Sequence, residues 1–228
     1  MTTPSSFGYA SRMKVVVTAG PTYEPLDEVR RLTNFSTGKL GSELANFLTE
    51  HGHDVVLLVG YYAIHRGALK ARKVETFTTT SDLSARLEAF STQGIGAVFH
   101  AAAVSDFTFG GVWEQDQEGR LIQCAERKIS TRKGQLLAEL KPTAKIIGNL
   151  RGWFPQARLV GWKYELDGGR AQVIDVARQQ LAKNGTNACV VNGAAYGEGF
   201  GLVTGAGPCE HLADAPELYQ ALGRLIGS

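Results

Sequence analysis

The 228-residue chain has little cysteine and no long apolar run, and each shortage excludes a class of protein. Its three cysteines lie far apart and form no Cys-x-x-Cys pair, which favours reduced thiols over a disulfide framework. No apolar stretch approaches the ~18 residues of a membrane span. Residues 1–12 are polar and lack the apolar core of a signal peptide. We therefore expect a cytoplasmic protein.

Charge of one sign is also scarce. Lysine and arginine number 24 against 22 acidic residues, so the formal net charge is only +2. No long run of basic residues occurs, and nothing in the composition indicates a nucleic acid or an anionic membrane as a partner.

Familiar phosphate-binding motifs are missing as well. The dinucleotide fingerprint Gly-x-Gly-x-x-Gly fails because no glycine lies between Gly20 and Gly38. A P-loop would need glycine at Thr33 and serine or threonine at Leu40. Neither a zinc-ligand spacing nor a Gly-x-Ser-x-Gly elbow is found.

What the chain does contain is an alternation of apolar β-branched runs with segments of helical periodicity. We predict strands near residues 14–18, 54–60, 73–77, 95–103, 158–162, 188–192 and 202–204, and helices near 40–50, 81–90, 142–151, 173–183 and 216–226. Ser81 or Asp82 should cap the second helix, and Pro142 should lie in the first turn of the third. The alternation predicts one α/β domain over residues 1–228, with a Rossmann-like, doubly wound, mostly parallel sheet.

Residues 104–135 interrupt this pattern. They are polar and rich in glycine and charge, which indicates a flap-like insertion, since long irregular segments in a compact domain are usually functional. Lys128 belongs to a basic segment of this insertion, and a cation there suits a polyphosphate. A solvated surface run is the alternative interpretation.

Ligands of such sheets bind at the carboxyl ends of the strands. After the first strand, Ser36 and Gly38 precede a helix and Lys39 follows them, which fits an anion site, although a plain capped helix has the same residues. After the fourth strand, the Asp106 carboxylate could bind a ribose hydroxyl or a magnesium ion. The alternative is an aspartate that only caps a helix or forms a turn. The aromatic ring of Trp162 could stack on a nucleotide base, or it could simply pack in the hydrophobic core.

Together these segments resemble phosphopantothenate–cysteine ligase, also called phosphopantothenoylcysteine synthetase. The resemblance rests most on residues 33–41 (Thr-Asn-Phe-Ser-Thr-Gly-Lys-Leu-Gly), supported by 18–22 (Thr-Ala-Gly-Pro-Thr), 24–30, 101–106 (Ala-Ala-Ala-Val-Ser-Asp), 128–129, 142–147 and 160–165. It covers most of the chain from Lys14 to about Asn192.

The resemblance implies a two-step reaction of coenzyme A biosynthesis. The carboxylate of 4′-phosphopantothenate attacks the α-phosphate of CTP or ATP, and cysteine then displaces the nucleotide. Mg²⁺ and a homodimer are implied too. Bacterial members often carry a flavin-binding decarboxylase ahead of this domain. Only a short tail precedes Lys14, so we expect a stand-alone ligase without flavin.

The resemblance also implies roles for single residues. Asn34 corresponds to an asparagine that handles the acyl-nucleotide, and Lys128 to a flap lysine on the triphosphate. The nucleotide-binding positions implied are Gly20, Ser36, Gly38, Lys39, Ala102, Asp106, Trp162, Lys183 and Asn192, and no metal ligands are assigned. Trp162 replaces the usual phenylalanine, and Gly193 replaces an aspartate after Asn192, so the choice of nucleotide stays open.

Two other functions remain possible at this stage. A nicotinamide-dependent reductase would suit the fold, although the chain has no Tyr-x-x-x-Lys pair. A nucleotide-binding relative that has lost catalysis would explain the changes after Asn192.

Overall fold

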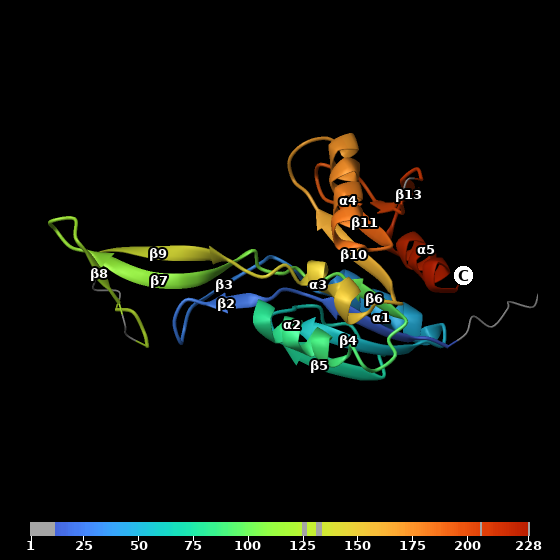
Figure 1. Cartoon of the computed structure of the whole chain (residues 1–228), viewed down its shortest axis with the longest axis horizontal. Coiled ribbons are helices and arrows are strands. Elements are labelled where there is room, and N and C mark those ends of the chain that lie inside the picture. The colour runs from blue at the N-terminus through green and yellow to red at the C-terminus, as the bar shows by residue number, and fades with distance from the viewer. Residues whose placement is uncertain (1–11, 125–126, 131–133, 206, 228) are drawn as a thin grey trace, which may run out of the picture.

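Figure 1 shows an α/β body from which a long β arm projects. This computed structural model describes residues 12–124, 127–130, 134–205 and 207–227. Nearly all of the predicted polar tail at 1–12, and parts of the basic segment around Lys128, lie outside the described residues.

The body is built on one eight-stranded sheet in the order β13-β12-β11-β10-β6-β1-β4-β5. Its strands are β1 (Lys14–Ala19), β4 (Asp54–Gly60), β5 (Lys73–Phe77), β6 (Ala97–His100), β10 (Arg158–Tyr164), β11 (Ala188–Asn192), β12 (Phe200–Val203) and β13 (Glu210–Leu212). All neighbours from β5 to β11 pair in parallel, and only β12 and β13 are antiparallel. The predicted Rossmann-like, mostly parallel sheet is thereby confirmed.

Five helices cover the two faces of the sheet: α1 (Lys39–Glu50), α2 (Thr80–Ala89), α3 (Ile146–Trp153), α4 (Arg170–Asn184) and α5 (Ala215–Gly227). Successive side chains of β1 point to opposite faces of the sheet. Val15 and Val17 join the core cluster under α1 and α5, whereas Val16 packs with α2 and α3. All three side chains are fully buried, as expected of a parallel strand covered on both sides.

Two helix starts differ from the sequence prediction. Thr79 caps α2, because its side chain accepts a hydrogen bond from the backbone N–H of Asp82, so neither Ser81 nor Asp82 is the cap. Pro142 does not open α3. It is the last residue of β9 and pairs with Phe107, and the helix begins only at Ile146.

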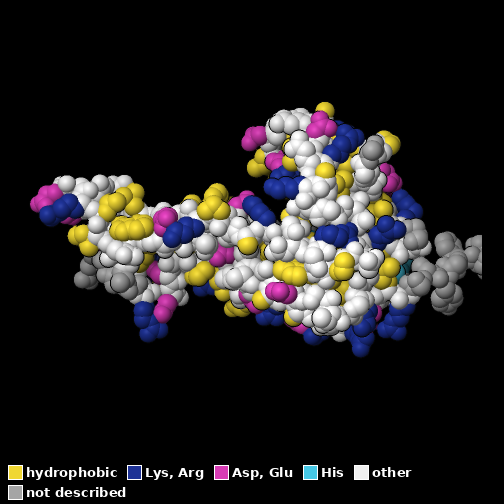
Figure 2. All heavy atoms as spheres, in the orientation of Figure 1, with side chains coloured by type: hydrophobic (Ala, Val, Ile, Leu, Met, Phe, Trp, Pro, Cys, Tyr) yellow, Lys and Arg dark blue, Asp and Glu magenta, His cyan; other side chains and the backbone are white. Residues whose placement is uncertain are grey.

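The arm is a three-stranded antiparallel sheet of β7 (Phe107–Gln115), β8 (Leu121–Gln123) and β9 (Gln135–Pro142). It contains most of the predicted insertion and continues past residue 135. Figure 2 shows hydrophobic side chains on its surface. The exposed apolar residues of the arm are Phe107, Leu121, Ile122, Leu137 and Leu140.

A small hairpin joins β1 to α1. It consists of β2 (Tyr23–Pro25) and β3 (Arg31–Thr33), neither of which was predicted. Within the described residues, no helix is both long and apolar enough to cross a bilayer.

The sheet has its switch point between β1 and β6. The chain moves from β1 to β4 and β5 on one side, and from β6 to β10 and β11 on the other. The loops that leave β1 and β6 lie side by side, since the Ala103 N–H donates to the Gly20 carbonyl at 3.0 Å and the Thr22 N–H to the Ala103 carbonyl at 3.1 Å. A ligand crevice is expected at this place.

Candidate active site at the carboxyl edge of the sheet

Two cavities open at this switch point. One, of about 670 Å³, lies against the start of α1 and is called the α1 cavity. The other, of about 460 Å³, lies between α3 and α4 and is called the α4 cavity. Ala102, Val104, Trp162 and Lys163 line both of them. The two cavities are therefore neighbours with one wall in common.

Most of the predicted site residues meet in the α1 cavity. Those that line it are Gly20, Asn34, Ser36, Gly38, Lys39, Ala102, Trp162 and Asn192. They come from five places in the sequence, and the segments after β1 and β6 and the carboxyl ends of β10 and β11 bring them together.

The start of α1 is shaped by a glycine with positive φ. Gly38 is the N-cap residue at φ 77° and contributes no side-chain cap. A Cβ at Gly38 would come within 2.9 Å of the Ala63 Cβ and 3.3 Å of the Gly20 Cα. Only glycine therefore fits between these loops. The Thr37 Oγ1 accepts the backbone N–H of Lys39 at 3.2 Å. The following N–H groups of the helix start and the Lys39 side chain offer donors and positive charge to an anion.

Asn34 bridges two of the loops. Its Nδ2 donates a hydrogen bond to the Ala103 carbonyl at 3.2 Å. In the same cavity wall, the Trp162 Nε1 and Asn192 Oδ1 atoms are buried and have no hydrogen-bond partner among the described residues. Buried polar atoms are seldom left unpaired, so a polar ligand is their natural complement.

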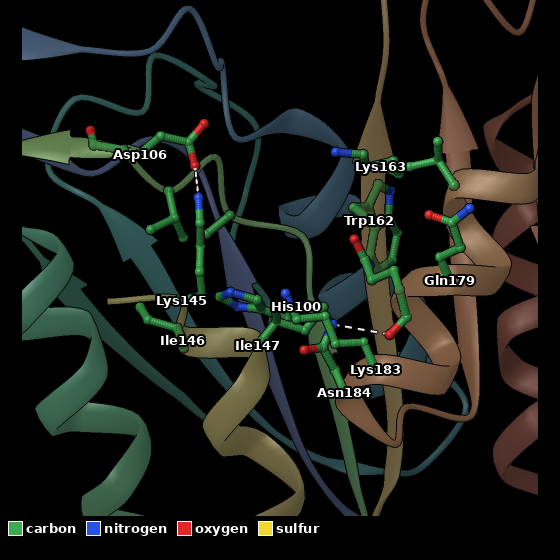
Figure 3. Close-up of a pocket in the computed structure, with 15 residues that line it drawn as sticks. His100, Asp106, Lys145, Ile146, Ile147, Trp162, Lys163, Gln179, Lys183 and Asn184 are labelled. Carbon is green, nitrogen blue, oxygen red and sulfur yellow. Dashed lines mark hydrogen bonds and ion pairs between the residues drawn. The ribbon is translucent and has the colours of Figure 1, made fainter. Parts of the chain in front are cut away.

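The α4 cavity holds the other predicted residues, Asp106 and Lys183. Figure 3 shows Asp106 on one side of it, joined to Lys145, with Trp162 and Gln179 on the other. Lys145 and Lys163 also line this cavity and were not predicted as site residues. Three lysines against one aspartate leave an excess of positive charge, which suits a polyanion.

His100 forms part of the floor of the α4 cavity. It is 6% exposed, and burial lowers its pKa to about 4. Its Nδ1 lies 3.0 Å from the Thr18 Oγ1, which accepts the Ala102 N–H at 3.1 Å. The lowered pKa keeps His100 neutral at neutral pH, and the hydrogen bond between its Nδ1 and the Thr18 hydroxyl fits either neutral tautomer.

The buried imidazole should make the protein less stable in acid. The unfolded chain protonates His100 near its ordinary pKa of 6.5, whereas the folded protein keeps it neutral down to about pH 4. The unfolded state binds more protons in this window, so the free energy of unfolding falls as the pH falls. The contribution amounts to ~3 kcal/mol at most.

The measurement is urea unfolding of the wild type and of His100→Asn between pH 7 and pH 4.5. The variant should lose less stability over this range, because other titrating groups contribute equally to both proteins. Parallel curves would show that His100 is protonated in the folded state.

The predicted flap residue Lys128 lies elsewhere. It is exposed and belongs to neither cavity. Its neighbours hold it to the turn between β2 and β3: Arg127 pairs with Glu28, and the Ile129 N–H donates to the Asp27 carboxylate at 3.2 Å. The structure thus brings Asn34 and the predicted nucleotide-binding residues together, but not Lys128.

A family model described as the DNA/pantothenate metabolism flavoprotein C-terminal domain matches residues 10–207. The chain belongs to this family. The match runs from before β1 to beyond β12, so it includes every residue that lines the two cavities.

Two curated relatives are similar to this protein over most of its length. The coenzyme A biosynthesis bifunctional protein CoaBC of Thermococcus kodakarensis is 32% identical over 180 residues, which cover 78% of this chain and 41% of that protein. The CoaBC of Bacillus subtilis is 31% identical over 191 residues, covering 83% of this chain and 43% of that protein. The chain thus spans less than half the length of these relatives.

Solved structures agree on the fold. The crystal structure of the DNA/pantothenate metabolism flavoprotein from Streptococcus pneumoniae superposes with a TM-score of 0.80 at 26% identity, covering 94% of this chain and 98% of that one. A Cab2 variant in complex with phosphopantothenate-cysteine superposes with a TM-score of 0.67 at 20% identity, covering 93% and 86%.

Proposed function

We propose that the protein is a phosphopantothenate–cysteine ligase of coenzyme A biosynthesis, which joins 4′-phosphopantothenate to cysteine through an acyl-nucleotide. The observation that carries the proposal is the pair of adjoining cavities with a common wall. An acid and a nucleotide must meet end to end in this reaction, and two neighbouring anion-binding cavities suit that arrangement. The CoaBC relatives support the same pathway.

The two cavities differ in what they offer. The α1 cavity supplies a helix start and Lys39, which suit a phosphate group. The α4 cavity supplies lysines together with the amides of Gln179, Gln180 and Asn184, which suit a polar base or sugar. Whichever substrate enters which cavity, the carboxylate and the α-phosphate meet at the common wall.

We further propose that Mg²⁺ arrives with the nucleotide. The described residues contain no group of three or more His, Cys, Asp or Glu side chains that would hold a metal. Mg²⁺ commonly binds one or two carboxylates together with phosphate oxygens and water. Asp106 is the carboxylate in the wall of the α4 cavity, so it fits such a phosphate-borne ion.

A homodimer belongs to the proposal as well. The arm exposes Phe107, Leu121, Ile122, Leu137 and Leu140, and apolar patches of this kind favour association. Light scattering coupled to size exclusion measures the mass directly, and a monomer at all concentrations would remove this part of the proposal.

The test of the activity is pyrophosphate release from CTP or ATP at equal concentrations, with phosphopantothenate and with or without cysteine. We expect release that requires phosphopantothenate, and continued turnover only when cysteine is present. Binding of a triphosphate without turnover would favour a relative that has lost catalysis. Binding of NADPH without binding of any triphosphate would favour a reductase.

A further inference from the structure

Lys163 lies at the border of the two cavities. Along β10, Val160 and Trp162 pack against the cluster under α1 and α5, while Leu159 packs on the opposite face. The alternation of a strand therefore starts the Lys163 side chain on the face of α3 and α4. Lys163 nevertheless lines the α1 cavity as well as the α4 cavity, and it lies beyond Gly161, the last residue of β10 that pairs with β6.

Among the described residues, Lys163 is the only charged one that lines both cavities, since the other residues they share are Ala102, Val104 and Trp162. Lys39 lines only the α1 cavity, and Lys145 and Lys183 line only the α4 cavity. Lys163 therefore belongs to the wall that the two cavities have in common.

A carboxylate holds the lysine in place. The Lys163 Nζ lies 2.8 Å from the Glu165 Oε1, and the two side chains are 34% and 32% exposed. The backbone of Glu165 is fixed on both sides, because its N–H donates to the Asn192 carbonyl at 3.0 Å and its carbonyl accepts the Ala195 N–H at 3.1 Å. The ion pair with Glu165 thus restrains the side chain of Lys163, a residue that lines both cavities.

Resting on the proposed ligase function, we infer that Lys163 is a catalytic residue of acyl-nucleotide formation and that Glu165 is its positioning residue. In this step a carboxylate oxygen of the acid bonds to the α-phosphorus. The bond from the α-phosphorus to the bridging oxygen breaks, and pyrophosphate leaves with the electron pair. Negative charge is spread over the α-phosphate oxygens, and no proton or redox partner is needed. The Lys163 ammonium stabilises this charge where the two cavities meet.

The experiment compares Lys163→Met and Lys163→Arg in pyrophosphate release measured without cysteine, so that only acyl-nucleotide formation is observed. Lys163→Met should lower the rate by about 10²-fold or more, as loss of a positioned charge donor commonly does. In a separate assay with cysteine present, where turnover continues, the KM for the nucleotide should change much less than kcat. Lys163→Arg keeps the charge and should recover part of the rate. Glu165→Gln should lower kcat less than Lys163→Met does.

A matched control exists at the far edge of the sheet. Lys73 and Glu75 on β5 form an ion pair with the same two-residue spacing, outside both cavities. Lys73→Met should release pyrophosphate at the wild-type rate.

If wild type releases no pyrophosphate with any triphosphate, the proposed function fails. If wild type is active and Lys163→Met stays within threefold of it, the inference about Lys163 alone fails. Equal losses in the methionine and arginine variants would also overturn it, since a role through charge requires them to differ.

Discussion

Replacing Asn34 by alanine should lower pyrophosphate release by about 10²- to 10³-fold, the usual cost of removing one positioned donor from a reacting oxygen. Asn34 lines the α1 cavity, and its Nδ2 is directed to the Ala103 carbonyl of the loop after β6. Its amide therefore stands between the loops that would hold the acyl-nucleotide. Asn34→Asp keeps the shape but loses both N–H donors, so it should be impaired as well.

Asn46 provides the control for this experiment. Its Nδ2 also donates to a loop carbonyl, that of Ala68 at 2.7 Å, but it lies on α1 outside both cavities. Asn46→Ala should leave the rate near that of the wild type even if it costs some stability. If the two variants lose activity equally, Asn34 acts only by holding a loop.

A large loss of activity is also expected from replacement of Asp27, which lines neither cavity. Its carboxylate accepts hydrogen bonds from the backbone N–H groups of Val29 at 3.0 Å, Arg30 at 2.7 Å and Ile129 at 3.2 Å. The Arg30 guanidinium holds the pKa of Asp27 far below its ordinary value, so these contacts persist in mild acid. We propose from the family resemblance that Lys128 acts on the triphosphate, although it lines neither cavity in this structure. On that proposal, Asp27→Ala should release the segment that carries Lys128 and lower activity by about 10²-fold, a typical cost of misplacing a group that acts on the substrate.

A double-variant cycle separates placement of Lys128 from general damage. If Asp27 acts by placing Lys128, then Asp27→Ala, Lys128→Ala and the double variant should have similar rates, because linked residues are not additive. Asp116 is the control. It accepts the N–H groups of Glu118 and Arg120, both at 2.9 Å, in a similar turn at the tip of the arm. Additive losses, or an Asp116→Ala variant as slow as Asp27→Ala, would contradict the placement role.

The central sheet was predictable because its strands are buried on both faces. Residues 15–17, for example, are three consecutive valines, and a buried strand of that kind is visible in a sequence. The arm was not predictable as strands. Most of β9 is exposed, so no alternation of apolar and polar residues marks it, and its pairing with β7 is a long-range property.

The site divides in the same way. Gly20, Ser36 and Asp106 could be singled out because they follow predicted strands or precede a helix. Lys163 could not, because its importance depends on two cavities meeting beside it. The neutral state of His100 likewise depends on its burial among elements that are distant in the sequence. Lys128 was predicted from the family resemblance. Its position outside the cavities follows from contacts of its neighbours with the turn between β2 and β3, which the sequence does not reveal.

Strand β10 supplies one wall to both cavities through Trp162 and Lys163. A ligand that shifts this wall changes the affinity of the neighbouring cavity, and thermodynamic reciprocity makes the factor the same in both directions. Substitutions in β10 that alter the choice of nucleotide should therefore carry over to recognition of the acid. Under the proposed function, the specificities for the nucleotide and for the acid are therefore coupled at β10, and substitutions intended to change only one of them belong on α1 or α4.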